Sequence, residues 1–199
     1  MIAIIDYGMG NLSSVRNALD FLGLENKITA EAEEILEADK VILPGVGAFA
    51  DAIGTLREGG YDAVIKRVVA DNKPLLGICL GYQLMFEKSW EFGEYEGLGL
   101  LPGEIKKLEV PLKIPHVGWN SLEKAFESKL FAGLESGQYV YFVHSYVLEG
   151  TPDFVSCYTT YGTRFPVSVE KGNIHGVQFH PEKSGKAGLQ ILRNFGALS

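Results

Sequence analysis

The sequence of 199 residues lacks the features that mark several large classes of protein. It has only two cysteines, Cys79 and Cys157, which do not amount to the disulfide framework of a small secreted domain. Asp and Glu number 25 against 18 Lys and Arg, so the basic excess that binding to a nucleic-acid backbone requires is missing. No apolar run approaches the length needed to cross a bilayer. We therefore expect neither nucleic acid nor a membrane as a partner.

The amino-terminal stretch indicates where the protein works. Its apolar run reaches the acidic residue Asp6 after five positions, and such a run is too short for the core of a signal peptide. The stretch also carries no basic leader. We expect a cytoplasmic, reduced protein. In that setting Cys157, inside the strand-like segment 154–158, is expected to pack in the core as a small apolar residue.

Strand-like and helix-like segments alternate in the first half of the chain. Short apolar runs predict strands at 2–5, 41–43 and 75–78, and helical spacing predicts helices at 12–22, at 51–71 with an interruption at Gly59–Gly60, and at 82–88. This order predicts a parallel sheet covered by helices on both faces.

The second half is richer in strands. β-Branched and aromatic residues predict strands at 139–143, 154–158, 167–169 and 174–179, and a threefold apolar spacing predicts a helix at 186–195. No linker is visible. We therefore expect residues 1–199 to form a single α/β domain with a mixed, mostly parallel sheet.

The pentapeptide at 77–81, Gly-Ile-Cys-Leu-Gly, is the most informative segment. It fits the pattern of a nucleophile flanked by glycines on a sharp turn from strand to helix, with cysteine as the nucleophile. The start of the following helix favours the thiolate form. The alternative is that Cys79 is a buried apolar residue.

A histidine and a glutamate follow the strand predicted at 174–179. A thiol nucleophile needs a base, and the base needs a third group to fix its tautomer. Residues two apart on an extended chain point to the same side, so His180 and Glu182 are expected to lie side by side, with Pro181 fixing the backbone between them. His175 falls on the opposite face of the strand and is expected to be structural.

The glycine-rich segment Pro-Gly-Val-Gly at 44–47 is a candidate oxyanion site. Attack on an amide develops negative charge on oxygen, which preorganised N–H groups stabilise. The N–H of Leu80 is one expected donor, and this loop is the second. A plain loop after a strand is the alternative; a phosphate loop fits less well, because no Gly-Lys-Ser/Thr follows.

These segments together resemble the triad (class I) glutamine amidotransferases and, among them, the glutaminase subunits of imidazole glycerol phosphate synthases. The matching segments run from end to end of the chain: Ile5–Leu12, Leu43–Phe49, Gly77–Leu84, Pro115–Asn120, Tyr141–Tyr146 and Phe179–Ser184. The resemblance implies a flavodoxin-like fold and cleavage of glutamine to glutamate and ammonia without a metal or a cofactor.

The resemblance also implies roles for particular residues. The nucleophile, acid/base and orienting residue would be Cys79, His180 and Glu182, and the oxyanion hole would come from Leu80 with Gly47 or a flip of the Val46–Gly47 peptide. Residues expected to hold glutamine are Gly45, Gln83, Glu91, and the backbone at His144, Ser145 and Tyr146. Those expected to face a partner are Asn11, Val117, Trp119 and Lys183.

The implied partner is a (β/α)₈-barrel cyclase subunit in a heterodimer, which would receive the ammonia. The cyclase would make imidazole glycerol phosphate and aminoimidazole carboxamide ribotide in histidine biosynthesis. Three other interpretations remain: an amidotransferase subunit of another synthase, such as one for anthranilate or pyridoxal phosphate; a cysteine peptidase; and a non-catalytic relative. The last would be expected to lose Cys79 or His180, and both are present.

Overall fold

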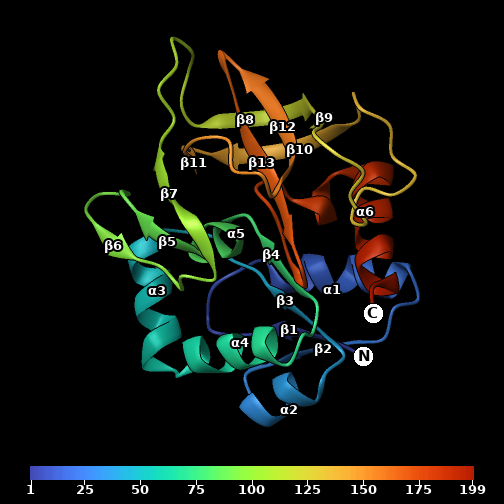
Figure 1. The fold of residues 1–199 in the computed structure, drawn as a ribbon. Coiled ribbons are helices and arrows are strands. Elements are labelled where there is room, and N and C mark those ends of the chain that lie inside the picture. The colour runs from blue at the N-terminus through green and yellow to red at the C-terminus, as the bar shows by residue number, and fades with distance from the viewer.

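Eight strands form one large sheet through the middle of the molecule, whose computed structural model describes residues 1–199 (Figure 1). These strands are β1 (Ile2–Ile5), β2 (Asn26–Thr29), β3 (Lys40–Leu43), β4 (Leu75–Ile78), β9 (Glu123–Lys124), β12 (Val155–Tyr161), β13 (Thr163–Lys171) and β14 (Ile174–Val177). Their order is β2-β1-β3-β4-β14-β13-β12-β9. The pairs from β2 to β14 are parallel, and those from β14 to β9 are antiparallel. The predicted mixed, mostly parallel sheet is confirmed.

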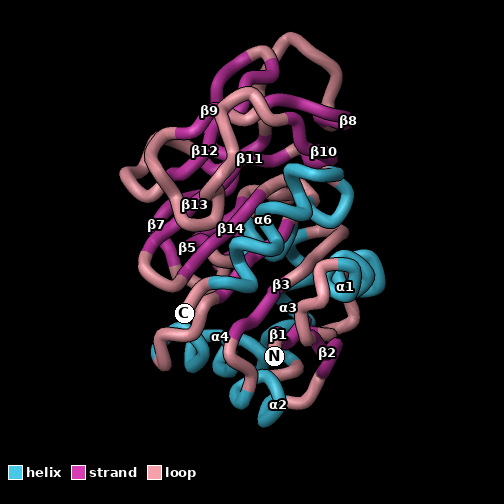
Figure 2. Tube along the Cα trace, turned by 90° about the vertical axis from the view of Figure 1, so that its right-hand side faces the viewer, coloured by secondary structure: helices cyan, strands magenta, loops and turns pink.

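Helices cover both faces of the parallel part (Figures 1 and 2). They are α1 (Leu12–Phe21), α2 (Ala32–Glu37), α3 (Phe49–Glu58), α4 (Tyr61–Ala70), α5 (Leu80–Leu84) and α6 (Gly185–Ala197), with a single 3₁₀ turn, η1 (Pro181–Lys183). Successive residues of a strand point to opposite faces. In β1, Ala3 and Ile5 pack toward α2, α3 and α4, whereas Ile2 and Ile4 pack toward α1 and α6. The continuous apolar strands are therefore buried on both sides, as expected for a parallel sheet.

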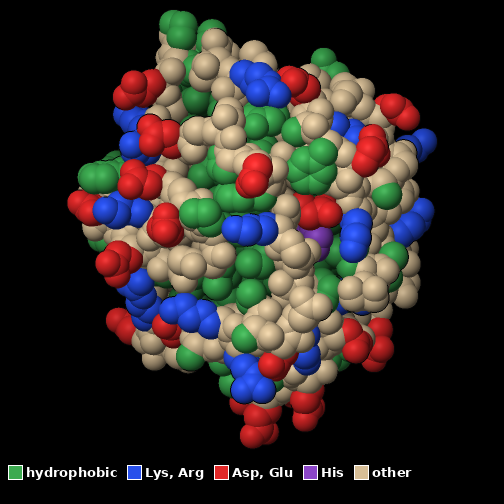
Figure 3. All heavy atoms as spheres, in the orientation of Figure 1, with side chains coloured by type: hydrophobic (Ala, Val, Ile, Leu, Met, Phe, Trp, Pro, Cys, Tyr) green, Lys and Arg blue, Asp and Glu red, His purple; other side chains and the backbone are tan.

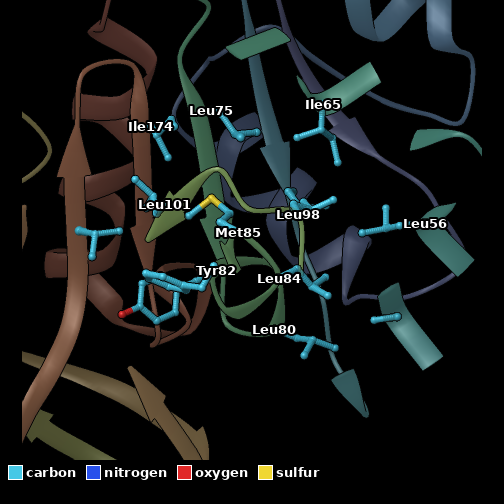
Figure 4. Packing of buried hydrophobic residues seen from close by; sticks show 14 of the residues in the cluster. Leu56, Ile65, Leu75, Leu80, Tyr82, Leu84, Met85, Leu98, Leu101 and Ile174 are labelled. Atoms are coloured by element: carbon cyan, nitrogen blue, oxygen red, sulfur yellow. The ribbon is translucent and has the colours of Figure 1, made fainter. Parts of the chain in front are cut away.

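Figure 4 shows part of the core on the first of these faces. Leu56 of α3, Ile65 of α4 and Leu75 of β4 belong to one apolar cluster, and all three are fully buried. Tyr82 and Met85, from the segment after Cys79, belong to the same cluster. The elbow that carries Cys79 is thus anchored to the main apolar core.

Two smaller sheets extend the antiparallel end. One contains β5 (Phe86–Ser89), β6 (Tyr95–Glu96), β7 (Leu101–Lys107) and β11 (Tyr146–Leu148), and the other pairs β8 (His116–Ser121) with β10 (Tyr139–His144). The β8–β10 ribbon lies at the upper end of the molecule in Figure 1, beyond the helices. It supplies one wall of the cavity described below.

Most predicted elements are confirmed within a few residues, including the helical break, where Gly60 adopts a φ of 73° between α3 and α4. The helix predicted at 82–88 is wrong. Helix α5 ends at Leu84, and 86–89 form β5, which pairs with β7 and β6. The apolar residues at 82–86 suit either structure, and pairing with distant strands decides between them. Seven other strands and α-helices were not predicted: β2, α2, β6, β7, β8, β9 and β11. Of these, β2 is short and only its last residue is buried.

The surface is polar and mixed in sign. On the face drawn in Figure 3, acidic and basic side chains are interspersed. None of the helices is long and apolar enough to pass through a membrane. No cluster of three or more His, Cys, Asp or Glu side chains is placed to hold a metal ion.

Candidate active site

Cys79 occupies the sharp turn between β4 and α5. Its φ of 54° and ψ of −110° lie in a region that non-glycine residues rarely adopt, which costs on the order of 1–3 kcal/mol and is typical of functional sites. The flanking glycines are required by close backbone contacts. A Cβ at Gly81 would lie 1.9 Å from the carbonyl oxygen of Leu43, and one at Gly77 would lie 2.8 Å from Cα of Tyr82. The pattern in the sequence therefore reflects the space available at the turn.

His180 follows β14 and is paired with Glu182 from the 3₁₀ turn. Nδ1 of His180 lies 2.8 Å from Oε1 of Glu182, and the two side chains are only 2% and 1% exposed. Ser184 donates from Oγ to the His180 carbonyl at 2.6 Å, and the His180 N–H donates to the Tyr141 carbonyl at 3.0 Å. These bonds fix the ring with its Nε2 free of any hydrogen bond of good geometry.

The electrostatic environment favours a charged imidazole. Burial alone would lower the pKa of His180, but the Cys79 sulfur and the Glu182 carboxylate stabilise the protonated ring and together raise it. The sulfur-bearing Cys79 and the ring of His180 line the same cavity, and no hydrogen bond joins them. Loose geometry of this kind is common in enzymes without bound substrate.

Cys79 and His180 share the lining of one cavity of about 250 Å³. The other lining residues are Val46, Gly47, Leu80, Gln83, Glu91, Val143, Ser145 and Tyr146. Most of the residues predicted to contact glutamine are thus brought together. Gly45 and His144 do not line the cavity. A larger open groove of about 620 Å³, around Trp90 and Lys106, contains no nucleophile and base together, so the smaller cavity is the candidate site.

Glu91 provides a carboxylate at one side of this cavity. Its Oε2 accepts a hydrogen bond from the N–H of Phe49 at 2.6 Å, at the start of α3. Burial raises the pKa of Glu91, Asp51 adds to the effect, and the Phe49 N–H opposes it. A half-buried carboxylate that faces a cavity suits an ammonium group on a ligand.

Gln83 is held by two hydrogen bonds from its amide nitrogen. Nε2 donates to the Tyr146 carbonyl at 3.2 Å and to Oε1 of Gln178 at 2.9 Å. Because both acceptors are oxygens, the orientation of the amide is fixed and its own oxygen remains available to a ligand.

The loop at 44–47 packs directly against the elbow. The N–H of Leu80 donates to the Gly45 carbonyl at 3.3 Å, and the Tyr7 hydroxyl donates to the Pro44 carbonyl at 2.9 Å. Gly45 has no room for a side chain, since a Cβ there would lie 2.8 Å from the Gly81 nitrogen. Gly47 has a φ of 103°. The expected oxyanion donor at Leu80 is thus engaged by the loop in this structure.

Two residues near Cys79 were absent from the sequence prediction. Gln178 is fully buried and donates from Nε2 toward the Cys79 sulfur at 3.9 Å, and Val143 lines the cavity. Gln178 stands two residues before His180 in an apolar strand, on the same side by parity, and that signal could have found it. Val143 has no comparable signal, because its place depends on how β10 lies across the cavity.

The residues predicted to face a partner lie near the cavity on the surface. Val117 and Trp119 are 54% and 55% exposed on the outer face of β8, and Lys183 is exposed in η1. A Cβ on Gly185 would lie 4.0 Å from the Trp119 ring, so Trp119 sits close to η1. Asn11 is partly buried at the start of α1, which contacts η1.

Comparison with known proteins identifies the family. The family model described as "Glutamine amidotransferase class-I" matches residues 3–197. The protein named "Imidazole glycerol phosphate synthase subunit HisH" from Bacillus cereus (strain G9842) is 55% identical over 195 residues, which are 98% of this chain and 93% of the relative. The protein of the same name from Bacillus anthracis (strain A0248) is 53% identical over the same shares.

Solved structures support the fold. "Structure of PurLQS from Thermotoga maritima" superposes with a TM-score of 0.78 at 20% identity and covers 98% of this chain and 96% of that one. A "Crystal structure of glutamine amidotransferase" gives 0.77 at 21%, over 99% and 100%. The family model and the close relatives together show that this chain belongs to the class I glutamine amidotransferases, in the group of the imidazole glycerol phosphate synthase HisH subunits.

Proposed function

We propose that this chain is the glutaminase subunit of an imidazole glycerol phosphate synthase and that it supplies ammonia for histidine biosynthesis. The observation that carries the proposal is the meeting of Cys79 and His180 in one cavity beside Glu91, with His180 paired to Glu182 behind it. Nucleophile, base and orienting carboxylate form the minimal set for acyl transfer to a thiol. The 55% identity to HisH subunits supports the assignment to this synthase over others.

The reaction starts with attack of the Cys79 thiolate on the side-chain amide carbon of glutamine. Negative charge moves to the amide oxygen, which accepts hydrogen bonds from the N–H of Leu80 and from the loop at Gly47. The imidazolium of His180 gives its proton to the departing nitrogen, and ammonia leaves. His180 then takes a proton from water, which attacks the γ-glutamyl thioester and releases glutamate. Glu182 holds Nδ1–H throughout, so that Nε2 faces the reacting atoms.

Glutamine binds through its α-amino and α-carboxylate groups at the end of the cavity away from Cys79. Glu91 pairs with the α-ammonium group of glutamine, and the oxygen of Gln83 accepts from the same group. The backbone at Ser145 and Tyr146 contacts the α-carboxylate. The cavity of about 250 Å³ suits a single amino acid and is too small for an extended peptide.

The partner is a (β/α)₈-barrel cyclase that docks over Val117, Trp119, Lys183 and Asn11. Free ammonia would be wasted, so the isolated chain should be nearly silent. In support of this, the N–H of Leu80 is bonded to Gly45 and is unavailable to an oxyanion. A movement of the loop at 44–47 on partner binding that frees the Leu80 N–H from the Gly45 carbonyl, together with a flip of the Val46–Gly47 peptide, would complete the hole. Equal rates of glutamate release with and without the cyclase and its ligand would refute this gating.

The decisive variant is Cys79→Ala, measured in the complex with the cyclase. Glutamine-dependent synthesis should fall by on the order of 10⁴-fold or more, because no covalent intermediate can form. Synthesis from added ammonium salt should persist, because the cyclase is untouched. Mass spectrometry of the wild-type chain quenched with glutamine should find the γ-glutamyl thioester on Cys79. Loss of both activities, or glutamine use by the variant, would contradict the proposal.

A further inference from the structure

A pair of buried histidines connects the outward-facing β8–β10 ribbon to the cavity. His116 of β8 and His144 of β10 are register partners, and Nδ1 of His116 lies 2.9 Å from Nε2 of His144. Both side chains are buried, and neither lines the cavity. The proposed mechanism uses neither ring.

The direction of the hydrogen bonds in this pair is determined by their neighbours. Nδ1 of His144 lies 3.0 Å from the Tyr146 carbonyl, which can only accept, so this nitrogen carries the proton. Burial lowers the pKa of His144 to about 3 and also lowers that of His116, so both rings are neutral at pH 7. Nε2 of His144 therefore accepts from Nδ1–H of His116, whose own Nε2 lies 3.3 Å from Nδ2 of Asn120.

The chain of bonds continues from Tyr146 to the nucleophile. The same Tyr146 carbonyl accepts from Nε2 of Gln83, which also donates to Oε1 of Gln178. With its oxygen engaged in this way, Gln178 presents Nε2 to the Cys79 sulfur at 3.9 Å. Six side chains and one carbonyl thus form an uninterrupted series from Asn120 to Cys79.

We propose that His116, His144 and Gln178 are positioning residues of a hydrogen-bond relay that couples strand β8 to Cys79 and to the glutamine-binding backbone at Tyr146. The proposal rests on the proposed function. It names the hydrogen bonds through which the partner would regulate the glutaminase activity. Residues of β8 alternate: Val117 and Trp119 point outward to the partner, and His116 points inward to the relay. A partner that moves β8 therefore displaces the first donor of the series.

A simpler interpretation is that the histidines only satisfy each other inside the core. Their rings pack within an aromatic cluster, and buried polar groups need partners wherever they occur. That interpretation predicts a loss of stability on substitution and no selective loss of regulation. The two can be separated by variants that keep the packing and remove only the bonds.

The first test uses two substitutions at His116 and a control. His116→Phe keeps an aromatic ring stacked on Tyr161 and Phe142, at centroid distances of 4.2 and 4.9 Å, and removes the donor. His116→Asn retains a donor near the position of Nδ1. Ser156→Ala removes a different buried hydrogen bond, 2.8 Å to Ser168, from residues that do not line the cavity.

The measured quantity is the ratio of glutaminase rates with and without the cyclase and imidazole glycerol phosphate, with kcat and KM determined for each variant. His116→Phe should reduce this stimulation about tenfold, the effect of one well-placed hydrogen bond, and His116→Asn should restore most of it. Ser156→Ala should lower the unfolding midpoint without changing the ratio. Unchanged stimulation in His116→Phe, or an equal loss in the control, would overturn the proposal.

The second test needs neither glutamine turnover nor a partner. Gln178→Met is close to isosteric and removes the donor to the sulfur. In the isolated chain, the rate at which iodoacetamide alkylates Cys79 at fixed pH should fall about tenfold relative to wild type and Ser156→Ala. An unchanged rate would overturn the relay. If the wild-type complex shows no stimulation, the proposed gating is wrong, and the alkylation rates still decide whether Gln178 acts on the nucleophile.

Discussion

The parallel and antiparallel halves of this chain support the active site in different ways. In the parallel half, strands such as β1 and β4 are buried on both faces, and the backbones approach so closely that Gly81 has no room for a methyl group. This half holds Cys79 in place between β4 and α5. The side chains of this half are packed on all sides, so substitutions here should first lower the stability of the protein.

In the antiparallel half, the β8–β10 ribbon is buried on one face only. Its inner face holds His116 and His144, whereas its outer face exposes Trp119 and Tyr139, which are 55% and 59% accessible. Outward residues have little effect on folding and are free to contact another molecule. The parallel half is thus rigid around Cys79, whereas the ribbon presents one face to the core and the other to solvent.

The largest effect is expected at Gly81. Gly81→Ala would place a Cβ 1.9 Å from the Leu43 carbonyl oxygen, and the backbone of β3 cannot move away without disrupting the sheet. The free energy of unfolding should fall by about 3 kcal/mol or more. Gly118→Ala, in the ribbon, is the matched control. Gly118 has a φ of 129° but open space around it, and the loss should be about 1 kcal/mol. Urea unfolding of both variants measures the difference; similar losses would remove the contrast between the halves.

The next effect concerns the junction of the halves, where β14 ends. Glu182→Gln keeps the shape of the partner of His180 but removes its charge, so the imidazolium is no longer stabilised and its tautomer is no longer fixed. We expect kcat for glutamine in the complex to fall by roughly 10²–10⁴-fold. Cys157→Ala, a change at the buried cysteine remote from the cavity, should retain activity. Nearly full activity in Glu182→Gln would remove Glu182 from the triad.

A smaller effect on stability is expected at Glu170 in β13. Burial would raise the pKa of Glu170, but interactions with His175, Ser128 and the Lys129 N–H outweigh it and hold the pKa at about 2, below the ordinary 4.5. A carboxyl whose pKa is lowered by folding stabilises the protein above pH 4.5, and this stabilisation disappears as the pH falls from 4.5 to 2.

Glu170→Gln should therefore lower the unfolding midpoint at pH 7, and its difference from wild type should shrink below pH 4.5. Thermal unfolding at a series of pH values between 2 and 7 measures both quantities. A difference that is constant over this range would mean that the charge of Glu170 does not matter.

The same contrast explains what could be predicted from the sequence. The buried strands 2–5 and 75–78 were predicted to the residue, since a continuous apolar run leaves little choice. The elbow at Cys79 and the pairing of His180 with Glu182 follow from local sequence, because two-residue parity and glycine crowding are local constraints.

What escaped prediction depends on contacts distant in sequence. Residues 86–89 form a strand only because β7 lies beside them, and the relay from His116 to Gln178 joins segments 28 to 95 residues apart. Neither histidine has a local signature that separates it from a ligand or a structural residue. The engagement of the Leu80 N–H by Gly45 is likewise invisible in the sequence, because it depends on how closely the loop at 44–47 approaches the elbow.

The smallest effect on stability, and the most selective effect on assembly, is expected at Trp119. Its ring is 55% exposed and contacts Tyr141 edge-on at a centroid distance of 6.2 Å. Trp119→Ala should change the free energy of unfolding of the isolated chain by less than about 0.5 kcal/mol. Because exposed tryptophans are frequent hot spots in interfaces, the same change should weaken binding to the cyclase by about 2 kcal/mol or more.

Isothermal titration with the cyclase, with Phe21→Ala as a control for loss of an exposed aromatic ring on α1, separates the two effects. Equal affinities for Trp119→Ala and wild type would mean that the outer face of the ribbon is not the docking surface. The two halves would then differ only in the hydrogen-bonded residues on the inner face of the ribbon.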